Sequence, residues 1–82
     1  MTEYEYLYCR MLHSKLNTRI IANIFCNIMD DKLKIRIIRD NRKFYFDVDD
    51  ISNKICKGYS SDKIVEDCYT AYKKTILSYY FY

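Results

Sequence analysis

Residues 19–48 read RIIANIFCNIMDDKLKIRIIRDNRKFYFDV. Two polar pairs, Asp30-Asp31 and Asp40-Asn41, divide this stretch into three segments in which hydrophobic residues alternate with polar ones. Alternation with a period of two is typical of β-strands. Aspartate and asparagine tolerate the left-handed backbone that two-residue hairpin loops need. The sequence therefore predicts three antiparallel strands joined by two tight turns.

The positions of these turns determine how the strands pair. The first loop pairs Ile28 with Leu33, and the second pairs Ile37 with Phe44. A slip of one residue in either hairpin would bring charged side chains to the apolar face, so the pattern specifies the register strongly. Both registers place apolar residues on one shared face, which we expect to form the core: Ile20, Ala22, Ile24, Cys26, Ile28, Leu33, Ile35, Ile37, Phe44, Phe46 and Val48.

Two segments near the N-terminus have competing interpretations. Residues 15–29 also fit a helix, because Leu16, Ile20 and Ile24 recur every four residues, but isoleucine, phenylalanine, asparagine and cysteine are mediocre helix formers. We therefore expect a strand over residues 19–29. The alternation in EYEYLYC, residues 3–9, predicts a fourth strand, although tyrosines four residues apart also fit a helix. Residues 10–18 are then expected to be a connection that contains one helical turn around residues 14–17.

The chain beyond Val48 has a helical pattern. Asp49 or Asp50 is expected to N-cap a short helix that ends before Gly58. Ser60 or Ser61 is expected to N-cap a second, amphipathic helix that packs on the apolar face of the sheet. Its apolar positions recur at helical spacing: Ile64, Cys68, Tyr72 and Ile76. The aromatic tail, residues 79–82, is expected to dock on the protein or to form an interface. Residues 1–82 are thus predicted to be a single α+β domain, in which an antiparallel meander of three to four strands packs against the C-terminal helix.

The composition narrows the source and the class of partner. The 82 residues include ten tyrosines, one glycine and no proline or tryptophan, a bias typical of low-GC genomes such as those of some bacteria, their phages and AT-rich viruses. The formal net charge is +3. This charge is too small to require a nucleic-acid partner and excludes an acidic mimic of DNA.

The cysteines indicate a reduced compartment. Cys9, Cys26, Cys56 and Cys68 are widely spaced and form no CxxC pair. The N-terminus has no apolar leader segment, and no apolar run is long enough to span a bilayer. We therefore expect a cytoplasmic protein with buried free thiols. His13 is the only histidine. The sequence accordingly predicts no metal, no cofactor and no enzymatic activity.

The second face of the predicted sheet contains the candidate binding residues. Phe25, Arg36 and Tyr45 align in one cross-strand row, and Lys34 and Lys43 lie in the rows beside it. Such a row can stack on nucleic-acid bases while the lysines contact phosphates. It can equally be a ladder of cation–π and ion-pair contacts that stabilises the sheet, or a protein-binding surface anchored by arginine and tyrosine.

The C-terminal segment GYSSDKIVEDCYTAYKKTILSYYF, residues 58–81, resembles the terminal helices of small accessory proteins from phages and mobile elements of low-GC bacteria, among them the anti-CRISPR inhibitors. The resemblance is one of type and transfers no site residue. It implies binding to a larger protein or ribonucleoprotein in the host cytoplasm, and inhibition or modulation of that target. A nucleic-acid-binding module is the alternative function. The aromatic tail and a free strand edge are also compatible with a homodimer.

Overall fold

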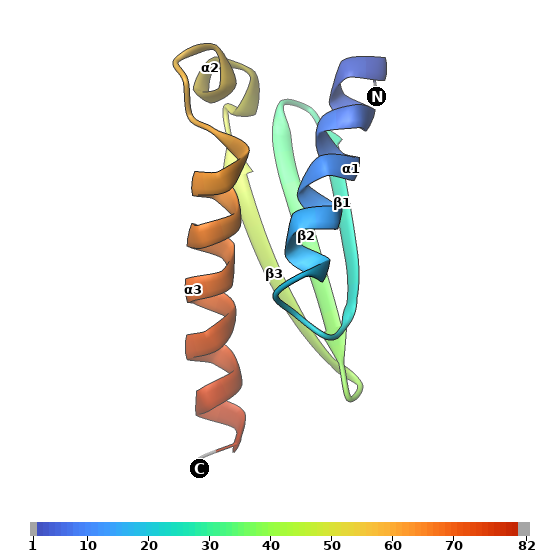
Figure 1. Ribbon diagram of the computed structural model, residues 1–82, viewed down its shortest axis with the longest axis vertical. Helices are drawn as coiled ribbons and strands as arrows, with labels where there is room; N and C mark the ends of the chain where they lie inside the picture. The colour runs from blue at the N-terminus through green and yellow to red at the C-terminus, as the bar shows by residue number, and fades with distance from the viewer. Residues whose placement is uncertain (1, 81–82) are drawn as a thin grey trace.

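The computed structural model describes the backbone of residues 2–80 and the side-chain surroundings of residues 2–76. The side chains of the predicted aromatic tail, residues 79–82, lie outside this description. The chain forms an α+β fold in which helices pack on a three-stranded antiparallel sheet, as predicted (Figure 1). Its elements are, in order, α1 (Glu3–Asn17), β1 (Asn23–Met29), β2 (Lys32–Arg39), β3 (Arg42–Asp49), α2 (Ile51–Cys56) and α3 (Ser61–Tyr80).

The sheet has the two predicted registers. Ile28 pairs with Leu33 across the first hairpin, and Ile37 pairs with Phe44 across the second. All four loop residues have a left-handed backbone, with φ of 53° and 58° at Asp30 and Asp31 and of 52° and 64° in the second loop. Positive φ at both central residues is the requirement of the type I′ turn, whose twist matches that of the flanking strands.

The core lies between the predicted apolar face of the sheet and the helices. Every residue predicted for that face is buried or packs against the buried cluster. Up to residue 76, the buried hydrophobic side chains of the helices are Tyr8, Cys9, Leu12 and Leu16 of α1, Ile51 of α2, and Ile64, Val65, Cys68 and Tyr72 of α3.

Residues 3–17 form helix α1, so the predicted fourth strand is wrong. The predicted connection over residues 10–18 is also wrong, except for the helical turn expected around residues 14–17. A capping box starts the helix: the Thr2 hydroxyl accepts a hydrogen bond from the Glu5 backbone N–H at 3.1 Å, and the Glu5 carboxylate accepts one from the Thr2 N–H at 3.4 Å. The buried positions Tyr8, Leu12 and Leu16 follow at intervals of four. The alternation of Tyr4, Tyr6 and Tyr8 is therefore typical of a strand, but the segment that contains it is a helix.

The boundary between α1 and β1 falls inside the stretch for which helix and strand competed. The helix ends at Asn17, where the Thr18 hydroxyl donates to the Lys15 carbonyl oxygen at 2.7 Å. The strand begins at Asn23, four residues later than predicted. Ile20 lies in the intervening loop and is nevertheless buried. The strand interpretation is thus confirmed for residues 23–29.

Helix α2 is capped by a residue that is distant in the sequence. Asp50 occupies the N-cap position, but its φ is 54° and its side chain makes no capping hydrogen bond. Asp31 in the first hairpin loop does so instead: its Oδ1 accepts from the Ser52 N–H at 2.9 Å, and its carbonyl oxygen accepts from the Ile51 N–H at 3.1 Å. Asp50 is therefore the N-cap residue, as predicted, but its side chain does not make the capping hydrogen bond. Hydrogen bonding to Ser52 also lowers the pKa of the Asp31 carboxyl.

The end of α2 and the start of α3 agree with the prediction from the sequence. Gly58 has φ of 82°, and the Tyr59 N–H donates to the Lys54 carbonyl oxygen at 2.9 Å, which is the pattern of a Schellman motif. The Ser60 hydroxyl accepts from the Lys63 N–H at 3.3 Å and caps α3. Asp62 lies in the first turn of α3, as predicted.

The two long helices run in the same direction and are staggered along the sheet (Figure 1). The last turn of α1 lies beside the first turn of α3, where the Lys15 ammonium contacts both the Ser61 hydroxyl and the Asp62 carboxylate at 2.8 Å. Helix α3 then continues past the end of α1, toward the β2–β3 hairpin loop. One end of the sheet is thus covered chiefly by α1 and the other by α3.

Charge is distributed unevenly between these two ends. The end with the first hairpin loop and the start of α1 carries most of the carboxylates, near Lys32, Lys54 and Lys57: Glu3, Glu5, Asp30, Asp31, Asp49 and Asp50. The end with the second hairpin loop and the later turns of α3 carries six of the 14 lysine and arginine residues, near only two carboxylates of the described residues, Asp40 and Glu66. These six are Arg19, Arg39, Arg42, Lys43, Lys73 and Lys74.

We predict opposite effects of the same type of substitution in the two hairpin loops. Asn41→Gly should raise the free energy of unfolding by a few tenths of a kcal/mol, because glycine adopts positive φ without the steric cost of a Cβ atom. Asp31→Gly should lower it, because the loss of the carboxylate leaves the Ser52 N–H without its capping acceptor. Denaturant unfolding of the two variants measures both effects, and equal stabilisation by both would contradict the capping role of Asp31.

Candidate functional site

The candidate site is the face of the sheet that the helices leave uncovered (Figure 1). The confirmed registers place Phe25 opposite Arg36 and Arg36 opposite Tyr45, so these three side chains form one cross-strand row. Phe25 is 47% exposed and Tyr45 is 62% exposed. Large aromatic side chains with this exposure are in the position that a partner surface would contact.

Arg36 is held in this row by its neighbour. Its guanidinium carbon lies 4.6 Å from the centroid of the Phe25 ring, which is the geometry of a cation–π contact. The ring therefore limits the conformations of the arginine while leaving the guanidinium at the surface. Arg36 has five N–H donors, and stacking on a ring does not use them.

The remaining predicted residues lie in the adjacent rows of the same face. Lys34 is paired with Asn27 on one side and Asp47 on the other, and Lys43 is paired with Ile38. The structure thus brings together all five residues predicted for binding: Phe25, Lys34, Arg36, Tyr45 and Lys43. Their role in binding remains a prediction.

This face also contains contacts of the kind expected for a ladder that stabilises the sheet. Besides the Arg36–Phe25 contact, Lys32 pairs with Asp49 across the strands at 3.4 Å. An exposed cation–π contact contributes about 0.5–1 kcal/mol and an exposed ion pair about 0.2–1 kcal/mol. Burying one isoleucine contributes about 1.5–3 kcal/mol. The inner face therefore dominates the stability of the sheet, and the outer row is free to vary without loss of the fold.

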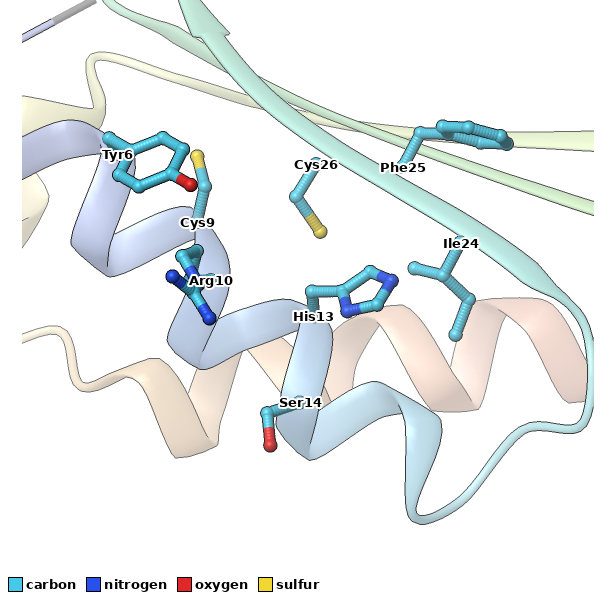
Figure 2. Close-up of a pocket in the computed structure, with 8 residues that line it drawn as sticks. All are labelled: Tyr6, Cys9, Arg10, His13, Ser14, Ile24, Phe25 and Cys26. Atoms are coloured by element: carbon cyan, nitrogen blue, oxygen red, sulfur yellow. The ribbon is translucent and has the colours of Figure 1, made fainter.

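A second concave feature lies between α1 and the edge strand β1 (Figure 2). This groove of about 390 Å³ is lined on α1 by Cys9, Arg10 and His13 and on β1 by Cys26, among other residues. Figure 2 shows Cys9, His13 and Cys26 on the walls that face each other. Cys9 and His13 are four residues apart in the sequence, so they lie about one helical turn apart on the same side of α1.

The chemistry of the thiols in this groove does not favour nucleophilic catalysis. Burial raises the pKa of the Cys26 thiol to about 12, with Cys9 and Cys68 adding to the shift, and burial also raises the pKa of Cys9. The reactive form of cysteine is the thiolate, and both groups are protonated at neutral pH. The Nδ1 atom of His13 lies 3.2 Å from the Asn17 amide nitrogen, within hydrogen-bond distance.

The part of the chain whose side chains are described, residues 2–76, contains no group of three histidine, cysteine, aspartate or glutamate side chains that could hold a metal ion. Two of the four cysteines, Cys9 and Cys68, are buried as predicted, Cys26 is half-buried, and Cys56 is exposed. The expectation of a buried thiol is therefore wrong for Cys56. No helix within the described part of the chain is both long enough and apolar enough to cross a membrane.

Helix α1 carries exposed apolar residues that the sequence interpretation did not identify. Tyr4, Leu7 and Met11 are 60%, 56% and 42% exposed and lie on one side of the helix. The strand assigned to residues 3–9 obscured them, since a strand would place Tyr4 and Leu7 on opposite faces. The Thr2-x-x-Glu5 pattern of the capping box was the local signal that could have identified the helix.

Comparison of the chain with protein-family models, with curated proteins and with solved structures found no significant match.

We predict that the four thiols differ sharply in reactivity. At pH 8, a pKa of about 12 leaves about one Cys26 thiol in ten thousand as thiolate, and Cys68, whose pKa burial also raises to about 12, behaves likewise. The exposed Cys56 should therefore be the one thiol that reacts rapidly with dithiobis(nitrobenzoate) in the folded protein, and all four should react in guanidinium. Cys56→Ser should remove the rapid phase. A second rapid phase in that variant would contradict the burial of the other three.

Proposed function

We propose that the protein is a small non-enzymatic binding protein, which occupies a surface of a larger host macromolecule through the open face of its sheet and so inhibits or modulates that target. The observation that carries this proposal is the exposed row of Phe25, Arg36 and Tyr45, on the sheet face that the helices of residues 2–80 leave open.

The composition of this row is that of an interface anchor. Tyrosine and arginine are enriched among the residues that contribute most to protein–protein binding. The contact of Arg36 with Phe25 at 4.6 Å restricts the arginine before binding, so less side-chain entropy is lost when a partner is bound. Lys34 and Lys43 supply charge around the aromatic residues, in the way that polar residues surround the centre of an interface.

Two further observations support a binding protein rather than an enzyme. The pKa of the thiols near His13 is raised by burial, so they are poor nucleophiles at neutral pH. The open sheet face presents side chains to a partner without enclosing a substrate. We infer a phage or viral origin from the amino-acid bias that is typical of low-GC genomes. The resemblance of type to anti-CRISPR proteins suggests a host protein or ribonucleoprotein in the cytoplasm as the target.

A nucleic-acid-binding module is the second candidate. The exposed rings of Phe25 and Tyr45 offer stacking surfaces, and Lys34, Arg36 and Lys43 could contact phosphates. Binding of this kind would weaken steeply with salt. The acidic residues Asp47 and Asp49 on the same face reduce the attraction for a polyanion, which favours a protein surface as the main partner.

Photo-crosslinking tests which face of the molecule meets the target. We predict that p-benzoylphenylalanine in place of Tyr45 crosslinks one dominant protein in a lysate of a low-GC bacterial host. The same replacement of Tyr4 is the matched control, because the two tyrosines are 62% and 60% exposed but lie on opposite sides of the molecule. The replacement at Tyr4 should therefore not crosslink that protein.

The Arg36→Glu variant should abolish the Tyr45 crosslink without unfolding the protein, because Arg36 lies on the exposed face. Nuclease treatment of the lysate distinguishes the two candidate functions. Nucleic acid would be favoured if the crosslink disappeared with nuclease and if labelled single-stranded RNA or DNA bound in a salt-sensitive way. A product of twice the chain mass, or equal crosslinking from Tyr4 and Tyr45, would contradict the proposal.

A further inference from the structure

At the basic end of the molecule, α3 continues beyond the last turn of α1 (Figure 1). A groove lies in this region, lined by side chains of α3, of β2 and of the loop after α1. It has a volume of about 300 Å³ and is bounded by the loop after α1, by the end of β2 and by α3. Arg19, Arg39 and Lys73 line it, one from each of these segments. Three cations from three separate parts of the chain thus meet around one groove.

Two of these cations are held by the same aromatic ring. The guanidinium carbon of Arg19 lies 5.0 Å from the centroid of the Tyr69 ring, and the ammonium nitrogen of Lys73 lies 4.6 Å from it. Their mutual repulsion is offset by the electrons of the ring and by Glu66, which pairs with Arg19. This ion pair is exposed to solvent, and exposed ion pairs contribute little. An anion in the groove would be attracted to both cations at once.

Arg39 lies on the helix-facing side of β2, two residues beyond the buried Ile37. Its nearest carboxylate in sequence, Asp40, is 3.9 Å away, at the outer limit of an ion pair. A guanidinium has five N–H donors in a planar fork that matches the oxygens of a phosphate. Arg39 therefore adds a third positive charge, with a geometry suited to phosphate, to the lining of the groove.

The most specific feature of this groove is a buried hydroxyl. Tyr72 lines the groove, is only 5% exposed, and its hydroxyl has no hydrogen-bond partner. The ring is fixed by an edge-to-face contact with Phe44, at 5.6 Å between centroids. A buried hydroxyl without a partner is energetically costly. Among the side chains of residues 2–76, the hydroxyl of Tyr8 is the other such group, and it lies beside a different groove, on α1.

We infer that this groove binds a phosphate monoester, and that this site is separate from the open face of the sheet. Three cations against the two carboxylates of Glu66 and Asp40 leave the groove net positive, which favours an anion, and the Tyr72 hydroxyl donates to one of the phosphate oxygens. The remaining wall is apolar and is formed by Ile20, Ile21 and Ile76. It suits the organic group of an ester rather than a bare inorganic ion. A volume of about 300 Å³ is at the lower end of the range for small-molecule sites.

The test is a titration of the folded protein with phenyl phosphate, followed by amide chemical shifts at constant ionic strength. Saturable shifts should be centred on Arg19, Arg39 and Lys73. Inorganic phosphate should bind at least about tenfold more weakly, because it cannot contact the isoleucine wall. Sodium chloride should not produce saturable shifts. Equal affinity for inorganic phosphate and the ester would overturn the assignment of a monoester, and the absence of saturable shifts would overturn the site.

Tyr72→Phe isolates the contribution of the hydroxyl, because it keeps the ring and its contact with Phe44. We expect it to weaken phenyl phosphate binding by about tenfold, the effect of losing one hydrogen bond to a charged group. The thermal midpoint of the ligand-free protein should stay the same or rise, since the unpartnered hydroxyl is gone.

Tyr8→Phe is the matched control, because it removes the other buried unpartnered hydroxyl and should leave the affinity unchanged. Lys73→Gln should weaken binding, whereas Lys74→Gln, at the next position of α3, should weaken it much less. Unchanged affinity in Tyr72→Phe, or an equal loss in Tyr8→Phe, would contradict the proposed role of Tyr72.

Discussion

The rest of the structure depends on two left-handed hairpin loops that fix the registers of a half-buried sheet. In a strand, successive side chains point to opposite faces. Once each loop is limited to two residues, the apolar set must therefore lie on one face and the polar set on the other. A slip of one residue would bury Lys34 and Arg36 and expose several isoleucines. Burying each isoleucine contributes about 1.5–3 kcal/mol, far more than any contact on the outer face.

Elements whose signals are local could be predicted, and those determined by distant residues could not. The registers, the end of α2 at Gly58 and the stripe on α3 all follow from residues close together in the chain. The cap of α2 comes from Asp31, 21 residues before Ser52, and no local pattern indicates it. The N-terminal helix is a different case: its capping box was visible, but the alternating tyrosines favoured a strand.

The same distinction applies to the candidate sites. The row of Phe25, Arg36 and Tyr45 follows from the strand registers, so it could be predicted from the sequence. The basic groove arises because α1 ends at Asn17 while α3 continues to Tyr80, which leaves one end of the sheet open beside α3. Its cations are separated by 20 and 34 residues in the chain. Their convergence is a property of the stagger between two helices, which no periodicity in the sequence encodes.

The uneven distribution of charge along the molecule has a consequence for how it meets a partner. The longest dimension is 40 Å, several times the screening length of about 8 Å at physiological ionic strength. At that distance the acidic end and the basic end do not neutralise each other, and the net charge of +3 describes neither. The molecule is an electric dipole. In the field of a charged partner it experiences a torque as well as an attraction, so that its orientation is selected before contact.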